Sequence, residues 1–325
     1  MKIEEACNLW LFEDFDKYAI SRQALLSQFL RIWLDKEYRN EKLTNISDCT
    51  KALKFFNKWI NSIEKKGKVR GENWSTKGFR YFVIRNKPRK NVETILSNIY
   101  PIGYIGYMSA IKHYELAPIN SNSIYFVTVD RINWKRLCLK KINRNFPELK
   151  ENKNLFKDIF GNIGENDLIP TYPLEEEIGK YHIAVINQKN LWTDEEWDSL
   201  RVIALPYLYI DMLRNPKYCG GLGQVLQIFN SLEAIELAEI IEILEKKSKS
   251  TDMDRARFGF IFDKIFQIKN DIFLNWKKEQ KFKRGGSRKL VSYLPFDSTY
   301  DEDWNISVNY DFAKPYASNT KLSEL

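Results

Sequence analysis

The sequence is poor in the residues that build metal and redox sites. Its 325 residues include four cysteines and two histidines. The cysteines lie far apart and form no C-x-x-C pair, and His113 and His182 have no third histidine or cluster of carboxylates beside them. We therefore expect reduced thiols, histidines with structural roles, and neither a metal nor a cofactor.

Long uncharged apolar runs are also missing. A membrane-spanning helix needs about 18 or more consecutive apolar residues. No uncharged apolar stretch of that length occurs in the sequence. The first apolar run, MKIEEACNLWLFEDFDKY, carries acidic residues throughout and does not resemble an export signal. We expect a cytoplasmic protein. With 44% hydrophobic and 14% aromatic residues, the chain can build two domains or more.

Two kinds of short motif lack the spacing that would make them sites. The run CGGLG at 219–223 has neither the G-x-G-x-x-G pattern nor the lysine of a phosphate-binding loop, so we predict a sharp bend between two helices. The acidic runs EEE at 175–177 and DEEWD at 194–198 have no histidines at ligand spacing. They are predicted to be a solvated loop and the N-terminus of a helix.

Positive charge, in contrast, is concentrated in one segment. Residues 61–90 hold ten basic and two acidic residues. The net charge of this segment, +8, equals that of the whole chain. A smaller basic focus follows at 281–289. Because local potential recruits a polyanion, the placement of this charge favours a nucleic-acid partner.

The residues around this segment predict two amphipathic helices and a β-ribbon. Residues 21–40 form one helix, and residues 47–67 form a second with an apolar stripe on one side and a basic ridge on the other. Strands are expected over 68–70 and 79–85, joined by the turn-forming residues 71–78. These are the parts of a winged helix-turn-helix. A solvated charged face over an ordinary core remains the alternative.

Beyond a linker at 87–91, the pattern changes to mixed α/β. Two short helices around a turn at 101–106, a strand at 123–130, a strand at 181–188 and a strand followed by a helix from Pro206 are predicted. No helix or strand is predicted for residues 131–180, although the run NWKRLCLKKINRNF within them is basic and amphipathic. Three helices follow between 232 and 283. We divide the chain into a winged-helix domain (1–90), a larger α/β domain ending in a helical bundle (91–310), and a loose tail (311–325).

The second half resembles the AbiEi-type antitoxins of type IV toxin–antitoxin systems, which act in abortive phage infection. The likeness rests on the order of PYLYIDMLRNPKYCGGLGQVLQIF at 206–229, YIGYMSAIKHYEL at 104–116, RARFGFIFDKI at 255–265 and GGSRKL at 285–290. It spans about residues 60–290. The N-terminal part is longer than the compact pattern of that family.

This resemblance implies an autorepressor and antitoxin without catalytic activity. Its N-terminal winged helix would bind inverted repeats of double-stranded DNA in its own promoter. Its functional partner would be a nucleotidyltransferase toxin, opposed without a stable complex. The residues then assigned to DNA are Lys51, Lys54 and Lys58 in the groove, and Lys68, Arg70, Lys77 and Arg80 on the wing.

Three alternatives stay open. An RNA-binding protein would use the same ribbon, with Trp74, Phe79 and Tyr81 as stacking platforms. A metal-dependent nuclease would use acids such as Asp194 and Glu196. An interaction module would present its basic face to an acidic protein, and residue types alone do not separate DNA from RNA.

Overall fold

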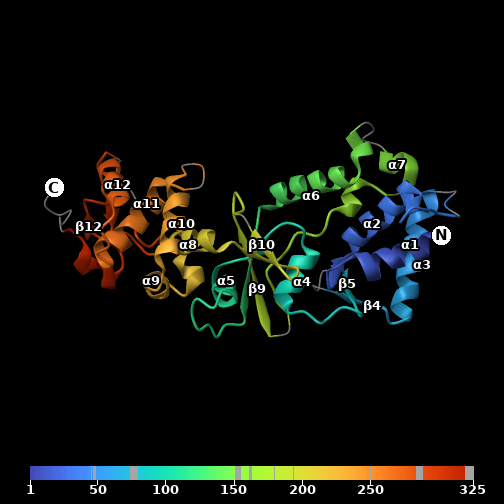
Figure 1. Cartoon of the computed structure of the whole chain (residues 1–325), viewed down its shortest axis with the longest axis horizontal. Helices are drawn as coiled ribbons and strands as arrows, with labels where there is room; N and C mark the ends of the chain where they lie inside the picture. The colour runs from blue at the N-terminus through green and yellow to red at the C-terminus, as the bar shows by residue number, and fades with distance from the viewer. Residues whose placement is uncertain are drawn as a thin grey trace. The chain divides into compact units, whose positions relative to one another are not determined.

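The chain forms two compact units (Figure 1). The computed structural model describes residues 1–44, 46, 49–73, 80–150, 155–160, 163–178, 180–192, 194–246, 248, 250–282 and 288–318. The first unit comprises Met1–Ile105 with Asn122–Val202, and the second comprises Gly106–Ser121 with Ile203–Leu325. No helix among the described residues has the length and hydropathy needed to cross a bilayer.

Helices and strands are mixed in the first two thirds of the chain, and helices dominate after residue 203. The helices are α1 (Ile3–Leu9), α2 (Arg22–Asp35), α3 (Ala52–Lys65), α4 (Val92–Ile99), α5 (Tyr107–His113), α6 (Arg131–Asn145), α7 (Leu155–Phe160), α8 (Leu205–Arg214), α9 (Leu222–Asn230), α10 (Ala234–Glu245), α11 (Asp252–Gly259) and α12 (Asp271–Lys281). The strands are β1 (Ala19–Ser21), β2 (Glu37–Tyr38), β3 (Glu41–Lys42), β4 (Val69–Asn73), β5 (Arg80–Ile84), β6 (Tyr104–Ile105), β7 (Ser123–Thr128), β8 (Glu176–Ile178), β9 (Tyr181–Asn187), β10 (Asp194–Trp197), β11 (Leu200–Ile203), β12 (Tyr300–Asp301) and β13 (Ile306–Ser307). The predicted mixed α/β class is confirmed.

The first unit begins with three helices and a small antiparallel sheet in the order β1–β5–β4. The hydroxyl of Ser21 caps α2 by accepting from the Ala24 N–H at 3.1 Å, as expected for a serine at this position. A 3₁₀ turn at Cys49–Lys51 precedes α3, which lies within the predicted range 47–67. The predicted antiparallel ribbon is confirmed by the pairing of β4 and β5 from Val69–Ile84 to Asn73–Arg80. Its first strand continues through residues 71–73, which the sequence assigned to the connection.

An aromatic core holds these helices together. The ring of Phe29 on α2 lies 5.4 Å from Phe56 and 5.9 Å from Trp59 on α3, measured between ring centroids. The same core includes Ile142 and Phe146 at the end of α6, together with side chains of α7. Residues far beyond 90 therefore belong to the same packed unit, and the division by contacts falls at residues 105, 122 and 202.

The larger sheet of this unit has the order β10–β11–β6–β7–β9–β8. Strands β7 and β9 pair in parallel over six residues, from Ser123–His182 to Thr128–Asn187. The predicted strands at 123–130, 181–188 and before Pro206 are confirmed as β7, β9 and β11. The short strand β6, in the predicted turn at 101–106, was not foreseen because two residues give no readable alternation.

The second unit is mainly helical, with β12 and β13 as a short antiparallel pair. The predicted bend at 219–223 is confirmed, since Gly220 and Gly221 have φ of 83° and 89° immediately before α9. The three helices predicted between 232 and 283 are α10, α11 and α12. A π-helical segment, Phe260–Ile265, continues α11.

Three local predictions need correction. DEEWD opens no helix: Asp194–Trp197 is strand β10, and Glu176 and Glu177 lie in β8, because hydrogen bonding to neighbouring strands outweighs the low strand propensity of acidic residues. The prediction of a loose tail over 311–325 is also wrong for its first residues. Asp311–Tyr316 is a 3₁₀ helix, and the Ser318 N–H and hydroxyl both donate to Asp301 at 2.9 Å. Residues 319–325 lie outside the described part.

We predict that Gly259→Ala destabilises the second unit. A Cβ at this position would lie 2.0 Å from the fully buried ring of Trp304, whose indole N–H donates to Asp263 at 3.1 Å. Overpacking costs about 1–3 kcal/mol, and more where neighbours cannot move. Because alanine regains about 1 kcal/mol through helix propensity, we expect a net loss of about 2 kcal/mol in the free energy of unfolding.

Thermal or urea unfolding followed by near-ultraviolet circular dichroism measures this loss. Gly164→Ala is the matched control, because a Cβ there meets nothing closer than Asp167 at 3.8 Å. Equal stability of the Gly259→Ala variant and the original chain would contradict the packing of Trp304 against α11.

Candidate nucleic-acid interface

The exposed side of α3 carries a line of cations. Lys51, Lys54 and Lys58 are exposed, while Phe56 and Ile60 on the opposite side are buried. This division follows from the spacing of three and four residues, which places the lysines on one helical face. We call Lys51, Lys54 and Lys58 the basic stripe. Within the described part of the chain, Lys54 and Lys58 form no ion pair.

The guanidinium of Arg22, at the start of α2, adjoins the basic stripe. It donates to the Asn57 side chain of α3 at 2.9 Å and lies 5.3 Å from the ring centroid of Phe56. Burial lowers the pKa of Arg22, and the charge of Arg80 lowers it further. These contacts bring Arg22 into the same positive region as the stripe, although the sequence did not mark it.

Arg80 joins the ribbon to α3. Its guanidinium donates to both carboxylate oxygens of Glu64, at 2.9 and 2.6 Å, and the Gly71 N–H donates to the same carboxylate at 3.1 Å. Glu64 therefore fixes the ribbon against the end of α3. The same contact offsets the charge of Arg80, so Arg80 adds less to the positive potential here than the exposed Lys54 and Lys58 do.

Arg70 lies on the opposite face of the ribbon from Arg80. In the antiparallel register Arg70 faces Val83, whereas Arg80 faces Asn73, and side chains alternate between faces along each strand. Arg70 forms an ion pair with Glu72 and lines a separate hollow of about 270 Å³ that also holds Arg85, Lys87 and Arg89. The structure therefore does not bring Arg70 and Arg80 onto one surface.

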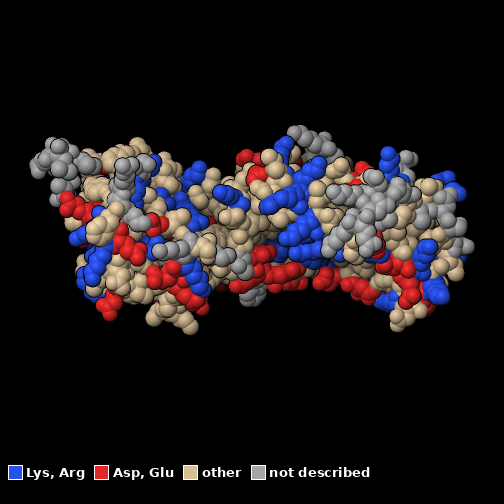
Figure 2. Space-filling model, turned by 90° about the horizontal axis from the view of Figure 1, so that it is seen from above, with Lys and Arg blue, Asp and Glu red and all other residues tan. Residues whose placement is uncertain are grey.

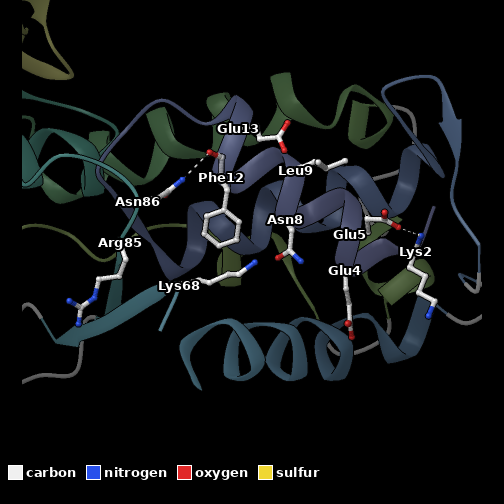
Figure 3. Close-up of a pocket in the computed structure, with 10 residues that line it drawn as sticks. All are labelled: Lys2, Glu4, Glu5, Asn8, Leu9, Phe12, Glu13, Lys68, Arg85 and Asn86. Carbon is white, nitrogen blue, oxygen red and sulfur yellow. Dashed lines mark hydrogen bonds between the residues drawn. The ribbon is translucent and has the colours of Figure 1, made fainter. Parts of the chain in front are cut away.

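Lys68 lies in a third environment. Its ammonium group is 5.3 Å from the ring centroid of Phe12, in a groove of about 770 Å³ along α1. Figure 3 shows Lys68 beside Phe12 and Asn8, with acidic side chains along the same groove. Lys77 and the possible stacking residues Trp74 and Phe79 lie outside the described residues. Tyr81, in contrast, is 5% exposed and donates to Glu72 at 2.5 Å, so it cannot serve as a stacking platform.

The acidic residues and histidines are engaged in contacts of their own. Glu196 accepts from Lys17 at 2.8 Å, and this bond is the main cause that lowers the pKa of Glu196. His182 lies in β9 between Glu177, 2.9 Å from Nδ1, and Glu175, 3.1 Å from Nε2. Within the described ranges, histidine, cysteine, aspartate and glutamate side chains form no group of three or more that could hold a metal ion.

Sequence reasoning missed a second cationic surface on α6. The helix carries six cations and no carboxylate: Arg131, Lys135, Arg136, Lys140, Lys141 and Arg144. Figure 2 shows Lys and Arg side chains gathered over this part of the molecule. The signal was visible in NWKRLCLKKINRNF, but the helix was not assigned because its charges interrupt the apolar pattern. Asp130 begins it by accepting from the N–H groups of Ile132 and Asn133, both at 3.0 Å.

We predict that Glu64→Ala loosens the ribbon. The variant leaves the Gly71 N–H and Arg80 without their acceptor. Because Arg80 is 43% exposed, solvent screens the lost ion pair, and we expect a loss of about 1 kcal/mol. Hydrogen exchange of the Gly71 amide should accelerate, while Lys65→Ala, an exposed neighbour on α3, should leave it unchanged. Equal exchange rates in both variants would contradict the Glu64 anchor.

Neither the protein-family models nor the curated proteins give a match to this chain.

Proposed function

We propose that this protein binds double-stranded DNA through its N-terminal helices and ribbon, as an autorepressor and antitoxin without catalytic activity. The observation that carries the proposal is the basic stripe on α3, exposed and followed directly by the ribbon β4–β5. Phosphates attract such a cluster, and an α-helix fits the major groove.

The order of elements supports a winged helix. Apart from the small β2–β3 hairpin, the chain runs α1, β1, α2, α3, β4, β5, and β5 lies between β1 and β4 in the sheet. In this arrangement α3 is the helix that enters the groove, and the connection between β4 and β5 is the wing. The exposed stripe faces away from the aromatic core, as is required of a helix that contacts DNA in the major groove.

The contacts favour some assigned residues over others. Lys51, Lys54 and Lys58 are the primary groove residues in this proposal, with Arg22 beside them. Arg80 shares its charge with Glu64 and contributes less, while Arg70 and Lys68 lie in other environments.

The regulatory part of the proposal rests on the resemblance to AbiEi-type antitoxins. The cytoplasmic protein would occupy inverted repeats in its own promoter and oppose a nucleotidyltransferase toxin without holding it in a stable complex. Co-expression with a nucleotidyltransferase encoded in the adjacent reading frame tests this part. Growth inhibition that this chain does not relieve would contradict it.

We predict that Lys54→Glu with Lys58→Glu weakens binding to the duplex upstream of the gene. Each lost phosphate contact lowers the slope of log K against log salt by about 0.9, so the slope should fall by about 2. Affinity should fall at least about tenfold. Arg80→Glu should have the smaller effect, since Glu64 already offsets its charge. Fluorescence anisotropy over a series of salt concentrations measures both quantities.

Lys278→Glu with Lys281→Glu is the charge-matched control, because both lysines are exposed on α12 in the second unit and neither is assigned to DNA. Unchanged affinity and slope in the Lys54 and Lys58 variant would rule out the basic stripe. Tighter binding to single-stranded RNA than to the duplex would favour the RNA alternative, and divalent-metal-dependent cleavage lost on Asp194→Asn would favour a nuclease.

A further inference from the structure

A concave site lies beside α6 within the first unit. It has a volume of about 380 Å³ and lies between the C-terminal half of α6, residues 101–104 after α4, and the segment that leads into β10 and β11. Its charged lining consists of Lys140, Lys141, Arg144, Arg201 and Asp194. Four cations therefore face one carboxylate.

Peptide oxygens, and not carboxylates, accept the hydrogen bonds of two of these cations. The Arg201 guanidinium donates to the Ser97 carbonyl at 2.9 Å, to the Pro101 carbonyl at 3.2 Å, and to the Tyr100 carbonyl. The Lys141 ammonium group donates to the same Pro101 carbonyl. These bonds fix both groups at the end of α4, and Asp194 is the one carboxylate in the lining of the site. In the described ranges none of the four cations forms an ion pair.

Such proximity is electrostatically unfavourable without an anion. Burial lowers the pKa of Lys141, and the neighbouring charge of Arg201 lowers it further. Burial also lowers the pKa of Arg201, although Asp194 and Glu196 oppose this shift. A multiply charged anion in the site would favour the charged forms of Lys141 and Arg201 and would raise the pKa of both groups.

The rest of the lining is mostly aromatic and apolar. Trp192, Leu191 and Leu137 line it, together with the fully buried Tyr104. The Tyr104 hydroxyl donates to Gln188 at 3.1 Å and accepts from the Trp192 N–H at 3.2 Å, which fixes the backbone at Trp192 against the larger sheet. A lining that combines several cations with aromatic and apolar side chains matches a ligand with a phosphate group and an aromatic ring.

We propose that this site binds a nucleotide with two or more phosphates, with the phosphates on Lys140, Lys141 and Arg144 and the base against Trp192. The volume is within the usual range of about 300–1,000 Å³ for small-ligand sites. The site shares no residue with the basic stripe, so it goes beyond the proposed DNA-binding function and stands apart from it. Phosphates of a nucleic-acid backbone are the other source of the same chemistry, and the test separates the two.

Isothermal titration calorimetry of the full chain tests the proposal with ADP, GDP, pyrophosphate and adenosine as probes. We expect binding of at least one nucleotide, weaker binding of pyrophosphate, and none of adenosine. Lys141→Gln with Arg144→Gln should weaken nucleotide and pyrophosphate binding by about tenfold or more, because charge-assisted hydrogen bonds are lost. Lys135→Gln with Arg136→Gln is the matched control, since both side chains are exposed on α6 and do not line the site.

Trp192→Leu separates the contribution of the aromatic side chain from that of the cations. It should weaken nucleotide binding about tenfold and leave pyrophosphate binding within about twofold, if stacking supplies the difference. Circular dichroism confirms that each variant is folded. Absence of binding by both nucleotides at about 1 mM would overturn the proposal.

Duplex binding reduced by the Lys141 and Arg144 variant, without any nucleotide binding, would also overturn the proposal and assign the surface to a nucleic-acid backbone. The variant Lys54→Glu with Lys58→Glu should bind nucleotide as the original chain does. The two proposals therefore fail independently.

Discussion

The first unit depends on the packing of α6 and α7 against the aromatic core of α2 and α3. Phe146 is fully buried and its ring lies 4.9 Å from that of Phe156 on α7, while Arg31 of α2 lies 5.5 Å from the Phe146 ring centroid. This contact joins residues more than a hundred positions apart. It places α6, which lies between β7 and β8 of the larger sheet in the chain, in the same core as the N-terminal helices. The basic stripe and the α6 site therefore share one framework.

Much of the fold could be predicted from the sequence where one strong local signal dominated. Ser21 capped its helix, the ribbon after Gly67 paired as expected, and the two glycines at 220 and 221 formed the bend. The failures have the opposite cause. Asp194–Trp197 became a strand through its neighbours in the sheet, and α6 was missed because its cations obscured the apolar positions that reach the distant core.

The candidate site was predictable in composition but not in arrangement. The spacing of Lys51, Lys54 and Lys58 correctly placed them on one exposed face of α3. Counting charges between 61 and 90 could not reveal that Arg80 meets Glu64 or that Arg70 meets Glu72. Such pairing depends on strand register and on contacts across the fold, and a sequence displays neither. Net charge therefore overstated the positive potential of the ribbon.

The register of β4 and β5 has one last consequence. Ile84, Phe82 and Val69 are buried in the core, and these side chains fix how the two strands align. Because β5 is buried on both faces from Tyr81 to Ile84, a slip of β4 by one residue would turn Val69 out of the core and Arg70 toward it. Hydrophobic anchoring thus holds the alignment that also brings Arg80 to Glu64 at the end of α3.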